Sequence, residues 1–344
     1  MINAGIIGAT GYAGVELVRL LLGHPEVNLT AISSVSFEGQ KISDVYPSLY
    51  NVCDLECKDQ TYVLQHSDVV FAALPHGLSE QMARTCIDAG KVFIDLGADF
   101  RLEDEEEYKT WYKGEYKDPE LHEQAVYGLP ELMRDKIKGK RLIANPGCYT
   151  TSVQLALAPA ILDSLVEVEG IIADCKSGVT GSGRGLSQTT HFAELNEAFA
   201  PYKVATHRHT PEIEQTFSHL SGQKVKLLFV PHLLPINRGI IATCYAKIKG
   251  DVSFDTIRNT YRRAYEDEYF VRLLPEGRTA DLKYVKYSNF CDISVHLDLR
   301  TNTLIAVSAI DNMVKGAAGQ AIQNMNIVFG FDEKTGLTVV PPAF

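Results

Sequence analysis

The stretch IIGATGYAG, residues 6–14, decides the fold class of this chain. It joins a strand-like apolar run at 2–7 to a run at 15–22 whose apolar residues have helical spacing. Glycines between a strand and a helix permit a tight turn, and they let backbone N–H groups approach a pyrophosphate at the helix N-terminus. The alternative is a plain strand–helix turn. In this context the pattern predicts a dinucleotide-binding loop made by Gly8, Thr10, Gly11, Tyr12, Ala13 and Gly14.

Strand-like and helix-like runs alternate on either side of that loop as far as residue 145. Strands are expected at 27–32, 68–74, 91–95 and 141–144, and a helix at 79–89. Repeated βα units of this kind predict an α/β fold with a parallel sheet covered by helices on both faces.

The pattern changes after residue 148. Strands are expected at 169–175, 224–230, 239–248, 289–300 and 303–310, with a hairpin turn at 300–302. Helices are expected at 211–220, 253–266 and 314–328. Consecutive strands joined by hairpins are typical of antiparallel pairing, so we expect a second domain of mixed α+β type.

Bulk properties limit the function classes. The chain has 344 residues, enough for two domains, and a net charge of −10, which argues against nucleic acid or an anionic membrane as partner. No run approaches the roughly 18 apolar residues of a membrane span. The N-terminal apolar run has no basic segment before it, and the 7 cysteines are scattered, so we expect a cytoplasmic protein. Cys53 and Cys57 lack further ligands nearby, and no metal site is expected.

Cys148 is the first candidate catalytic residue. It ends the tetrapeptide Asn-Pro-Gly-Cys at 145–148, where a strand-like run gives way to a helix-like one. A thiol in the first turn of a helix lies near the positive end of the helix dipole and near unpaired N–H groups, which favour the nucleophilic thiolate. The same N–H groups can hold an oxyanion. The alternative is a small buried side chain with no chemistry.

A second cluster follows at 207–213, with the sequence His-Arg-His-Thr-Pro-Glu-Ile. Thr210 is expected to cap a helix whose first residue is Pro211, which places His207 and His209 just ahead of the helix. A histidine near a reactive thiolate serves as general acid and base, and the residues leave open which of the two does so. The alternative is an ordinary surface or core histidine.

The glycine-rich loop at 177–185 carries hydroxyls and one cation, Arg184. Its amides and its guanidinium are suited to a phosphate or a carboxylate. The alternative is a loop without a special role.

Two segments bear on the cofactor. The second strand ends Ala-Ile-Ser-Ser-Val-Ser at 31–36, without the carboxylate that binds the ribose of NAD, so Ser33 and Ser34 favour NADP. The alternative is that these serines only decorate a turn. Pro75 and His76 follow a buried strand, at the edge where open α/β sheets bind ligands. His76 contacts the cofactor or caps the next helix, and the sequence does not choose between them.

Taken together, these segments resemble the N-acetyl-gamma-glutamyl-phosphate reductase family, the arginine-biosynthesis members of a group that includes aspartate-semialdehyde dehydrogenases. The matching stretches are 8–17, 73–77, 95–102, 127–131, 145–149, 207–213 and 311–321. The resemblance implies a Rossmann domain at 1–147, to which the C-terminal residues 314–344 return. It also implies a catalytic and oligomerisation domain at 148–313, and a homodimer or homotetramer.

The resemblance further implies an activity, the NADPH-dependent reductive dephosphorylation of N-acetyl-gamma-glutamyl phosphate to the 5-semialdehyde through a cysteine thioester. It implies Cys148 as nucleophile, His209 as acid/base and Asn312 as a cofactor contact. Arg208, Arg184 and His207 are the candidates for binding the substrate.

One departure and several rivals remain. The family often has Arg where this chain has Val35, which weakens the expectation of NADP over NAD. The rival substrates are aspartyl phosphate and the longer aminoadipyl phosphate. A rival of another class is a nucleotide-sensing protein without catalysis. That rival predicts damage at Cys148 or His209, and both are intact.

Overall fold

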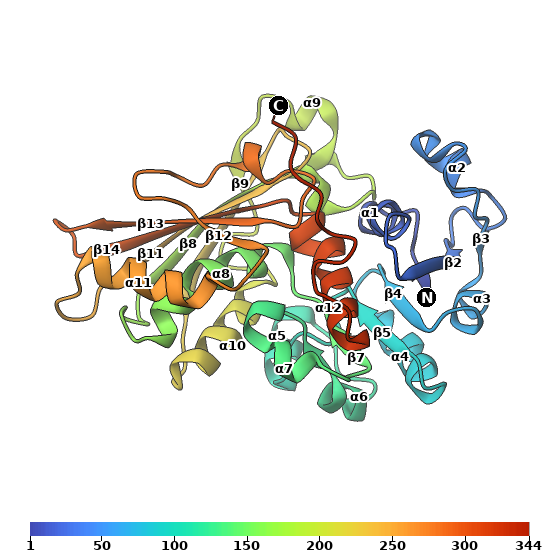
Figure 1. The fold of residues 1–344 in the computed structure, drawn as a ribbon, viewed down its shortest axis with the longest axis horizontal. Helices are drawn as coiled ribbons and strands as arrows, with labels where there is room; N and C mark the ends of the chain where they lie inside the picture. The colour runs from blue at the N-terminus through green and yellow to red at the C-terminus, as the bar shows by residue number, and fades with distance from the viewer. Residues whose placement is uncertain (344) are drawn as a thin grey trace. The chain divides into compact units, whose positions relative to one another are not determined.

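A computed structural model describes residues 1–343, which form two compact units (Figure 1). The first unit comprises 1–109, 113–146 and 317–339, and the second comprises 110–112, 147–316 and the chain from Val340. The chain therefore leaves the first unit after Pro146, builds nearly all of the second, and returns to the first at Ala317.

The first unit contains a seven-stranded sheet in the order β3-β2-β1-β4-β5-β7-β6. Every pairing in it is parallel, as the alternating pattern predicts. Its strands are β1 (Ile2–Ile7), β2 (Val27–Ser33), β3 (Cys57–Lys58), β4 (Val69–Ala72), β5 (Val92–Asp95), β6 (Val126–Tyr127) and β7 (Leu142–Ala144). The central strands β4, β5 and β7 are buried along their whole length, which is typical of a sheet covered on both faces.

Helices α1 and α7 of this unit both pack on α12, which comes last in the chain. The helices that begin in the N-terminal part are α1 (Tyr12–Leu21), α2 (Ile42–Val45), α3 (Gln60–Gln65), α4 (Ser79–Asp88), α5 (Glu105–Tyr112), α6 (Pro119–Gln124) and α7 (Pro130–Ile137), followed much later by α12 (Gly319–Phe329). A short 3-10 turn, η1, lies at Pro47–Leu49.

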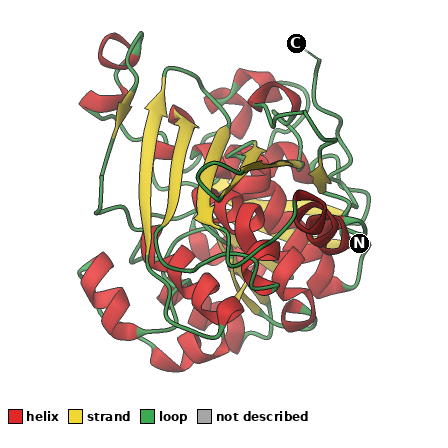
Figure 2. Cartoon of the chain, turned by 90° about the vertical axis from the view of Figure 1, so that its left-hand side faces the viewer, coloured by secondary structure: helices red, strands yellow, loops and turns green. Residues whose placement is uncertain are grey.

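The second unit contains a mixed sheet in the order β12-β13-β14-β11-β8-β10-β9. The strands of the chain are the yellow arrows in Figure 2. β8 pairs with β10 and β12 with β13 in parallel, and the other pairings are antiparallel, so the predicted mixed domain is confirmed. The strands are β8 (Ile171–Gly178), β9 (Ala200–Pro201), β10 (Leu227–Leu234), β11 (Ile240–Lys247), β12 (Val271–Leu273), β13 (Cys291–Asp298) and β14 (Thr303–Ile310).

One face of this sheet is covered by α8, against which α10 and α11 pack (Figure 1). The helices are α8 (Cys148–Leu162), α9 (Phe192–Leu195), α10 (Thr210–Ser221) and α11 (Phe254–Tyr265), with 3-10 turns η2 (Val179–Ser182), η3 (Gln188–Thr190) and η4 (Leu282–Tyr284). α8 is buried from Tyr149 to Ile161, which is why its sequence lacks a polar stripe. On the other face of the sheet, alternate side chains of β8 and β11 are only partly buried.

The structure refines one local prediction and shows that another was wrong. The helix expected at 314–328 begins as a π-helical turn, Val314–Ala318, and continues as α12. The Asp311 carboxylate accepts the N–H groups of Met313 and Val314 and so fixes the start of this turn. Thr210 does not cap α10: the helix begins at Thr210, and His209 holds the N-cap position without a side-chain cap. The cause is that the Thr210 N–H donates to the His207 carbonyl, at 3.0 Å, so the chain already turns one residue earlier.

Candidate active site

Cys148 is the first residue of α8, as the sequence predicts. The N-cap is Gly147, in an extended conformation with φ −67° and ψ 152°, and no side chain caps the helix there. The first-turn N–H groups of α8 therefore lie beside a thiol that is only partly buried, at the positive end of the helix dipole. This arrangement suits both a thiolate and an oxyanion formed by its attack on a carbonyl.

The imidazole of His209 lies against the residue that precedes this cysteine. A Cβ atom placed on Gly147 would lie 2.4 Å from His209 Nε2, a distance that no side chain tolerates. Any other residue at position 147 would force the ring or the backbone to shift. The fold brings together a histidine and a cysteine that are far apart in the sequence.

Glu212 joins the start of α8 to the first turn of α10. Its side chain is fully buried, and Oε1 accepts the Gly147 N–H at 2.9 Å and the Thr150 hydroxyl at 2.8 Å. Sequence reasoning missed this role, because a glutamate in the first turn of a helix is explained by the helix dipole alone. No signal in a single sequence shows that its partner is a main-chain N–H more than sixty residues earlier.

Gly316, in the π-helical turn, contacts Cys148 from another side. A Cβ atom at Gly316 would lie 2.8 Å from the Cys148 Cβ, so the turn presents bare backbone to the cysteine. π-helical turns are rare and occur frequently at functional sites.

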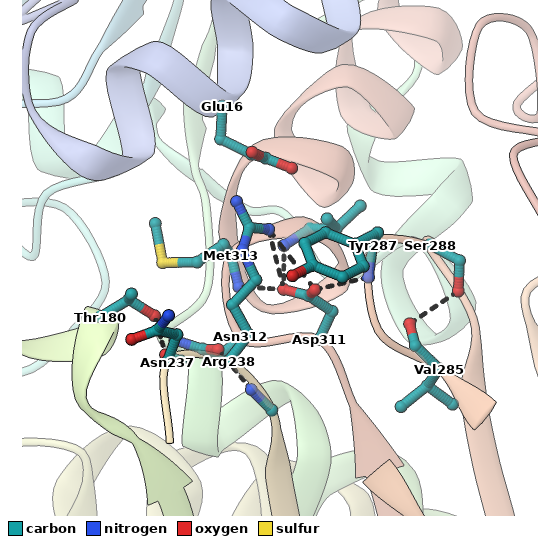
Figure 3. Close-up of polar contacts among 12 residues, drawn as sticks. Glu16, Thr180, Asn237, Arg238, Val285, Tyr287, Ser288, Asp311, Asn312 and Met313 are labelled. Atoms are coloured by element: carbon teal, nitrogen blue, oxygen red, sulfur yellow. Dashed lines mark hydrogen bonds and ion pairs between the residues drawn. The ribbon is translucent and has the colours of Figure 1, made fainter. Parts of the chain in front are cut away.

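Asp311 holds this turn (Figure 3). Its carboxylate is fully buried, accepts main-chain N–H groups of Tyr287 at 2.7 Å and Met313 at 2.8 Å, and pairs with Arg238 at 3.4 Å. The guanidinium of Arg238 in turn lies 5.0 Å from the centre of the Tyr287 ring. The sequence does not identify Asp311 or Arg238 as site residues, since each is explained only by these long-range contacts.

Asn312, expected to contact the cofactor, is nearly buried and bonded at both ends of its amide (Figure 3). Oδ1 accepts the Gly239 N–H at 2.8 Å, and Nδ2 donates to the Thr180 hydroxyl at 3.0 Å. An amide retains one further donor and acceptor in this state. Its role toward a cofactor stays a prediction.

Of the three residues expected to bind substrate, only His207 lies with Cys148 and His209. It is buried, and its ring centre is 4.7 Å from that of His209. Arg184 lies in the exposed loop that follows η2, and Arg208 is exposed, with its guanidinium 5.2 Å from the centre of the Tyr112 ring. The roles of both arginines stay predictions.

In the first unit, the glycine loop has the shape that a dinucleotide needs. Gly8 has φ +83°, and a Cβ atom there would lie 2.5 Å from the Ala73 carbonyl oxygen. A Cβ atom on Gly14 would lie 2.2 Å from the Gly8 carbonyl oxygen. Gly11 is the N-cap of α1, which has neither a side-chain cap nor an acidic residue in its first turn. The helix start, with Tyr12 and Ala13, is therefore suited to a phosphate.

The serines after β2 support that loop. The Ser33 carbonyl accepts the N–H groups of Gly8 and Ala9, and the Ser34 and Thr10 hydroxyls are 2.6 Å apart. Both serine side chains are buried, whereas Val35 is 86% exposed. The position at which the family often has Arg thus opens to solvent beside the predicted cofactor loop.

His76 does not cap the helix that follows it. Asp99 accepts the N–H groups of Gly77 at 2.7 Å and Ser79 at 2.8 Å ahead of α4, and its Oδ1 lies 2.5 Å from His76 Nδ1. Burial alone would raise the pKa of Asp99, but these bonds outweigh it and hold that pKa below its usual value. Asp99 therefore fixes the loop that carries His76 and the exposed Pro75.

Within residues 1–343, no group of three or more His, Cys, Asp or Glu side chains is placed to hold a metal ion. Nor does this part of the chain contain a helix long and apolar enough to cross a membrane.

The two units match the two family models of one enzyme class. Residues 3–140 match the NAD binding domain of semialdehyde dehydrogenases, and residues 148–312 match their dimerisation domain. The fold is similar to that of aspartate semialdehyde dehydrogenase II from Vibrio cholerae, with a TM-score of 0.72 at 16% identity over 95% of this chain and 98% of that one. The enzyme from Candida albicans, solved with NADP, gives 0.69 at 15% identity over the same shares. Fold and sequence thus define the semialdehyde dehydrogenase class.

Full-length relatives narrow this further. A reductase from Clostridium botulinum is 56% identical over 344 residues, covering 100% of both chains, and one from Brachyspira hyodysenteriae is 54% identical over 352 residues, also covering 100% of both. Both are named N-acetyl-gamma-glutamyl-phosphate reductase. The chain belongs to the N-acetyl-gamma-glutamyl-phosphate reductase family, as its motifs predict.

Proposed function

We propose that this protein reduces N-acetyl-gamma-glutamyl phosphate to N-acetyl-glutamate 5-semialdehyde with release of phosphate, a step of arginine biosynthesis. The observation that carries the proposal is the uncapped N-terminus of α8, where Cys148 lies with the His209 imidazole against the preceding residue. The full-length relatives named for this reaction support the choice of substrate.

Cys148 is proposed as the nucleophile. Its thiolate attacks the carbonyl carbon of the acyl phosphate, the first-turn N–H groups of α8 stabilise the oxyanion, and the C–O bond to phosphate breaks. The product of this half-reaction is a thioester, which accepts a hydride more readily than a carboxylate does. The buried Glu212 positions the cysteine by holding the Gly147 N–H and the Thr150 hydroxyl.

His209 is proposed as the acid/base. It donates a proton to the oxygen of the hemithioacetal and takes one back as that adduct collapses to aldehyde and thiolate. Its place at the N-cap of α10 puts the ring against Gly147, the residue that precedes the cysteine.

We propose that the first unit binds NADPH through residues of its glycine loop and residues at the ends of β2 and β4. The open helix start at Gly11 fits a pyrophosphate, and the absence of a carboxylate at Ser33 and Ser34 fits a 2′-phosphate. When bound, NADPH supplies the hydride that reduces the thioester. Gly8 and Gly14 keep the loop free of side chains where the backbone must approach the cofactor.

We also propose a homodimer or homotetramer in the cytoplasm. The dimerisation-domain match and the partly exposed sheet face of the second unit support self-association. Among residues 1–343, none of the seven cysteines forms a disulfide, which suits a reducing compartment.

The test is the reverse reaction, with N-acetyl-glutamate 5-semialdehyde, phosphate and NADP, followed by the absorbance of NADPH. The wild type should give phosphate-dependent turnover, and Cys148→Ser should give none. The control is Cys53→Ser, which changes a buried cysteine of the first unit and should retain turnover. Turnover by Cys148→Ser would refute the covalent mechanism. Turnover of the aspartyl or aminoadipyl aldehyde, with none of the proposed aldehyde, would reassign the substrate.

A further inference from the structure

His207 is enclosed by aromatic rings, and we call this enclosure the aromatic box. The ring centres lie 5.2 Å from it for Phe229, 5.6 Å for Tyr202 and 5.7 Å for Tyr149, and His209 closes the box at 4.7 Å. All four contacts are edge-on.

The charges around the aromatic box favour an uncharged ring. Burial is the main cause that lowers the pKa of His207, to about 2, and the nearby His209, Lys203 and Arg208 lower it further. Glu212 acts in the opposite direction. His207 is therefore neutral throughout the physiological range and cannot carry the proton that the reaction moves.

The neutral ring has a defined partner. Nδ1 of His207 accepts the main-chain N–H of His209 at 3.1 Å, which requires the ring proton to be on Nε2. The His207 carbonyl accepts the Thr210 N–H at 3.0 Å. Both bonds fix the chain at the residue whose imidazole lies against Gly147.

Tyr202 closes the aromatic box from the segment before α10. Its hydroxyl donates to the Tyr149 hydroxyl at 3.2 Å, and Tyr149 donates to Ser177 at 2.7 Å. The Tyr202 N–H donates to the Pro231 carbonyl at 3.0 Å, which ties this segment to β10. Tyr149 follows Cys148 directly, so the same hydroxyl chain reaches the cysteine end of the site.

We propose that His207 is a positioning residue of this reaction: its Nδ1 fixes the main chain of His209, and Tyr202 keeps its ring in place. The inference rests on the proposed function and assigns the two histidines different tasks. His209 moves the proton, and His207 holds His209.

The first test needs no activity. In full-length protein with ¹⁵N-labelled histidine, the His207 signals, assigned by their loss in His207→Phe, should show the Nε2–H tautomer unchanged from pH 5 to pH 8. A His207 ring that titrates near 6.5, or that carries its proton on Nδ1, overturns the proposal even if the protein is an active reductase. The tautomer result stands on its own if the proposed substrate fails.

The second test is kinetic. His207→Phe keeps the ring but removes the acceptor, and we expect kcat to fall about 100-fold, the size of a small misplacement of a catalytic group, with KM changed less than about threefold. His207→Asn, whose amide oxygen can replace Nδ1 as acceptor, should recover at least tenfold of that loss. Tyr202→Phe, which loses only the hydroxyl bond, should lower kcat by less than His207→Phe.

Two controls make the kinetic outcome decisive. His219→Phe, an exposed position in the last turn of α10, should leave kcat and KM unchanged. The pH profile of kcat in His207→Asn should keep the limbs of the wild type. Loss of a limb would make His207 the base, and a raised KM with unchanged kcat would make it a substrate ligand; either result overturns the proposal.

Discussion

Gly316 leaves bare backbone beside Cys148, and a substitution at this one residue tests whether the site needs it. In Gly316→Ala, the new methyl group would lie 2.8 Å from the Cys148 Cβ, so either the π-helical turn or the cysteine must move. We expect kcat to fall about 100-fold or more, since shifts near 1 Å carry that effect. The matched control is Gly23→Ala, where the methyl group would meet only the Leu20 carbonyl oxygen, at an ordinary contact distance of 3.7 Å. Equal activity of both variants in the reverse assay would contradict the expectation.

Val35 provides a test of cofactor choice. It is exposed beside Ser34, where a cation would face the 2′-phosphate proposed to bind there. Val35→Arg should tighten binding of NADPH about tenfold, for one charge-assisted contact, and leave NADH unchanged. Fluorescence titration of both cofactors measures this. NADH lacks the 2′-phosphate, so tighter binding of NADH by the same factor would show that position 35 does not face the 2′-phosphate.

Asp95 makes the stability of the protein depend on pH. It ends β5, fully buried, and burial and the nearby Asp99 raise its pKa to about 7 although Ser79 and Gly97 donate to it. Between pH 4 and pH 7 the folded state thus holds a proton that the unfolded state has lost. Stability therefore falls as pH rises through this window, by about 1.4 kcal/mol per unit of pKa difference.

The substitution Asp95→Asn removes this titration. Urea unfolding at pH 5 and at pH 8 should show that the wild type loses more stability between the two than the variant does, by a few kcal/mol. Carboxyl groups far from Asp95 contribute equally to both proteins. An identical loss in both would show that Asp95 is already ionised at pH 5.

Among the site residues, those with a local signature were predictable. Cys148 is marked by the turn before it, and the histidines by the Thr-Pro-Glu helix start that follows them. Glu212, Asp311 and Asp99 were not, because each acts on main-chain N–H groups of a distant or irregular segment. Only the folded chain shows which carboxylate reaches which turn.

At the scale of the element, α8 contains a proline that another helix compensates. Pro159 has no N–H to donate to the Leu155 carbonyl four residues earlier, and the Tyr265 hydroxyl of α11 donates to that oxygen at 2.5 Å. Removing the hydroxyl leaves a buried carbonyl unpaired. Tyr265→Phe should therefore lower the free energy of unfolding by about 1–3 kcal/mol.

A double-mutant cycle tests this account. In a Pro159→Ala background the restored N–H can donate to the Leu155 carbonyl. Tyr265→Phe should therefore lower the free energy of unfolding clearly less in that background than in the wild type. Tyr261→Phe is the matched control. The Tyr261 hydroxyl donates to the Ala156 carbonyl at 2.6 Å, but that carbonyl can also accept the helix N–H four residues later. Purely additive effects of Tyr265 and Pro159 would contradict the pairing.

Elements with strong periodicity were predictable, and irregular ones were not. The strands and helices on either side of residues 8–14 and 148 lie where the apolar pattern places them. The sequence does not distinguish the π-helical turn at 314–318 from regular helix, because its apolar residues continue those of α12; only the contacts of the buried Asp311 distinguish it.

At the scale of the whole molecule, the partly buried face of the second-unit sheet is the candidate surface for self-association. Ile172 is 37% exposed on β8, next to Tyr245 of β11 in the register. Ile172→Asp puts a charge into that face and should shift the sedimenting mass toward that of one chain. Leu299→Asp, at an 80% exposed position after β13, should leave it unchanged. A wild type that already sediments as one chain would refute the proposed oligomer.

The two sheet types followed from periodicity, whereas the domain bounds and the return of the C-terminal helix were implied only by the family resemblance. The sequence pattern separates a βα-alternating half from a hairpin-rich half, and the strand pairings agree. The order of strands within each sheet did not follow, since periodicity shows which residues are buried and not which strands are neighbours.

The return of the chain to the first unit also affects its synthesis. All seven strands of the first sheet leave the ribosome before Asn145, yet α12, whose residues from Gly319 to Ile327 are buried, emerges only after the whole second unit. At ordinary rates of translation this delay lasts on the order of ten seconds. Through that interval the surfaces of α1 and α7 that receive α12 are uncovered in the nascent chain. A ribosome stalled within the second unit would thus display an apolar site for chaperones that the finished protein hides.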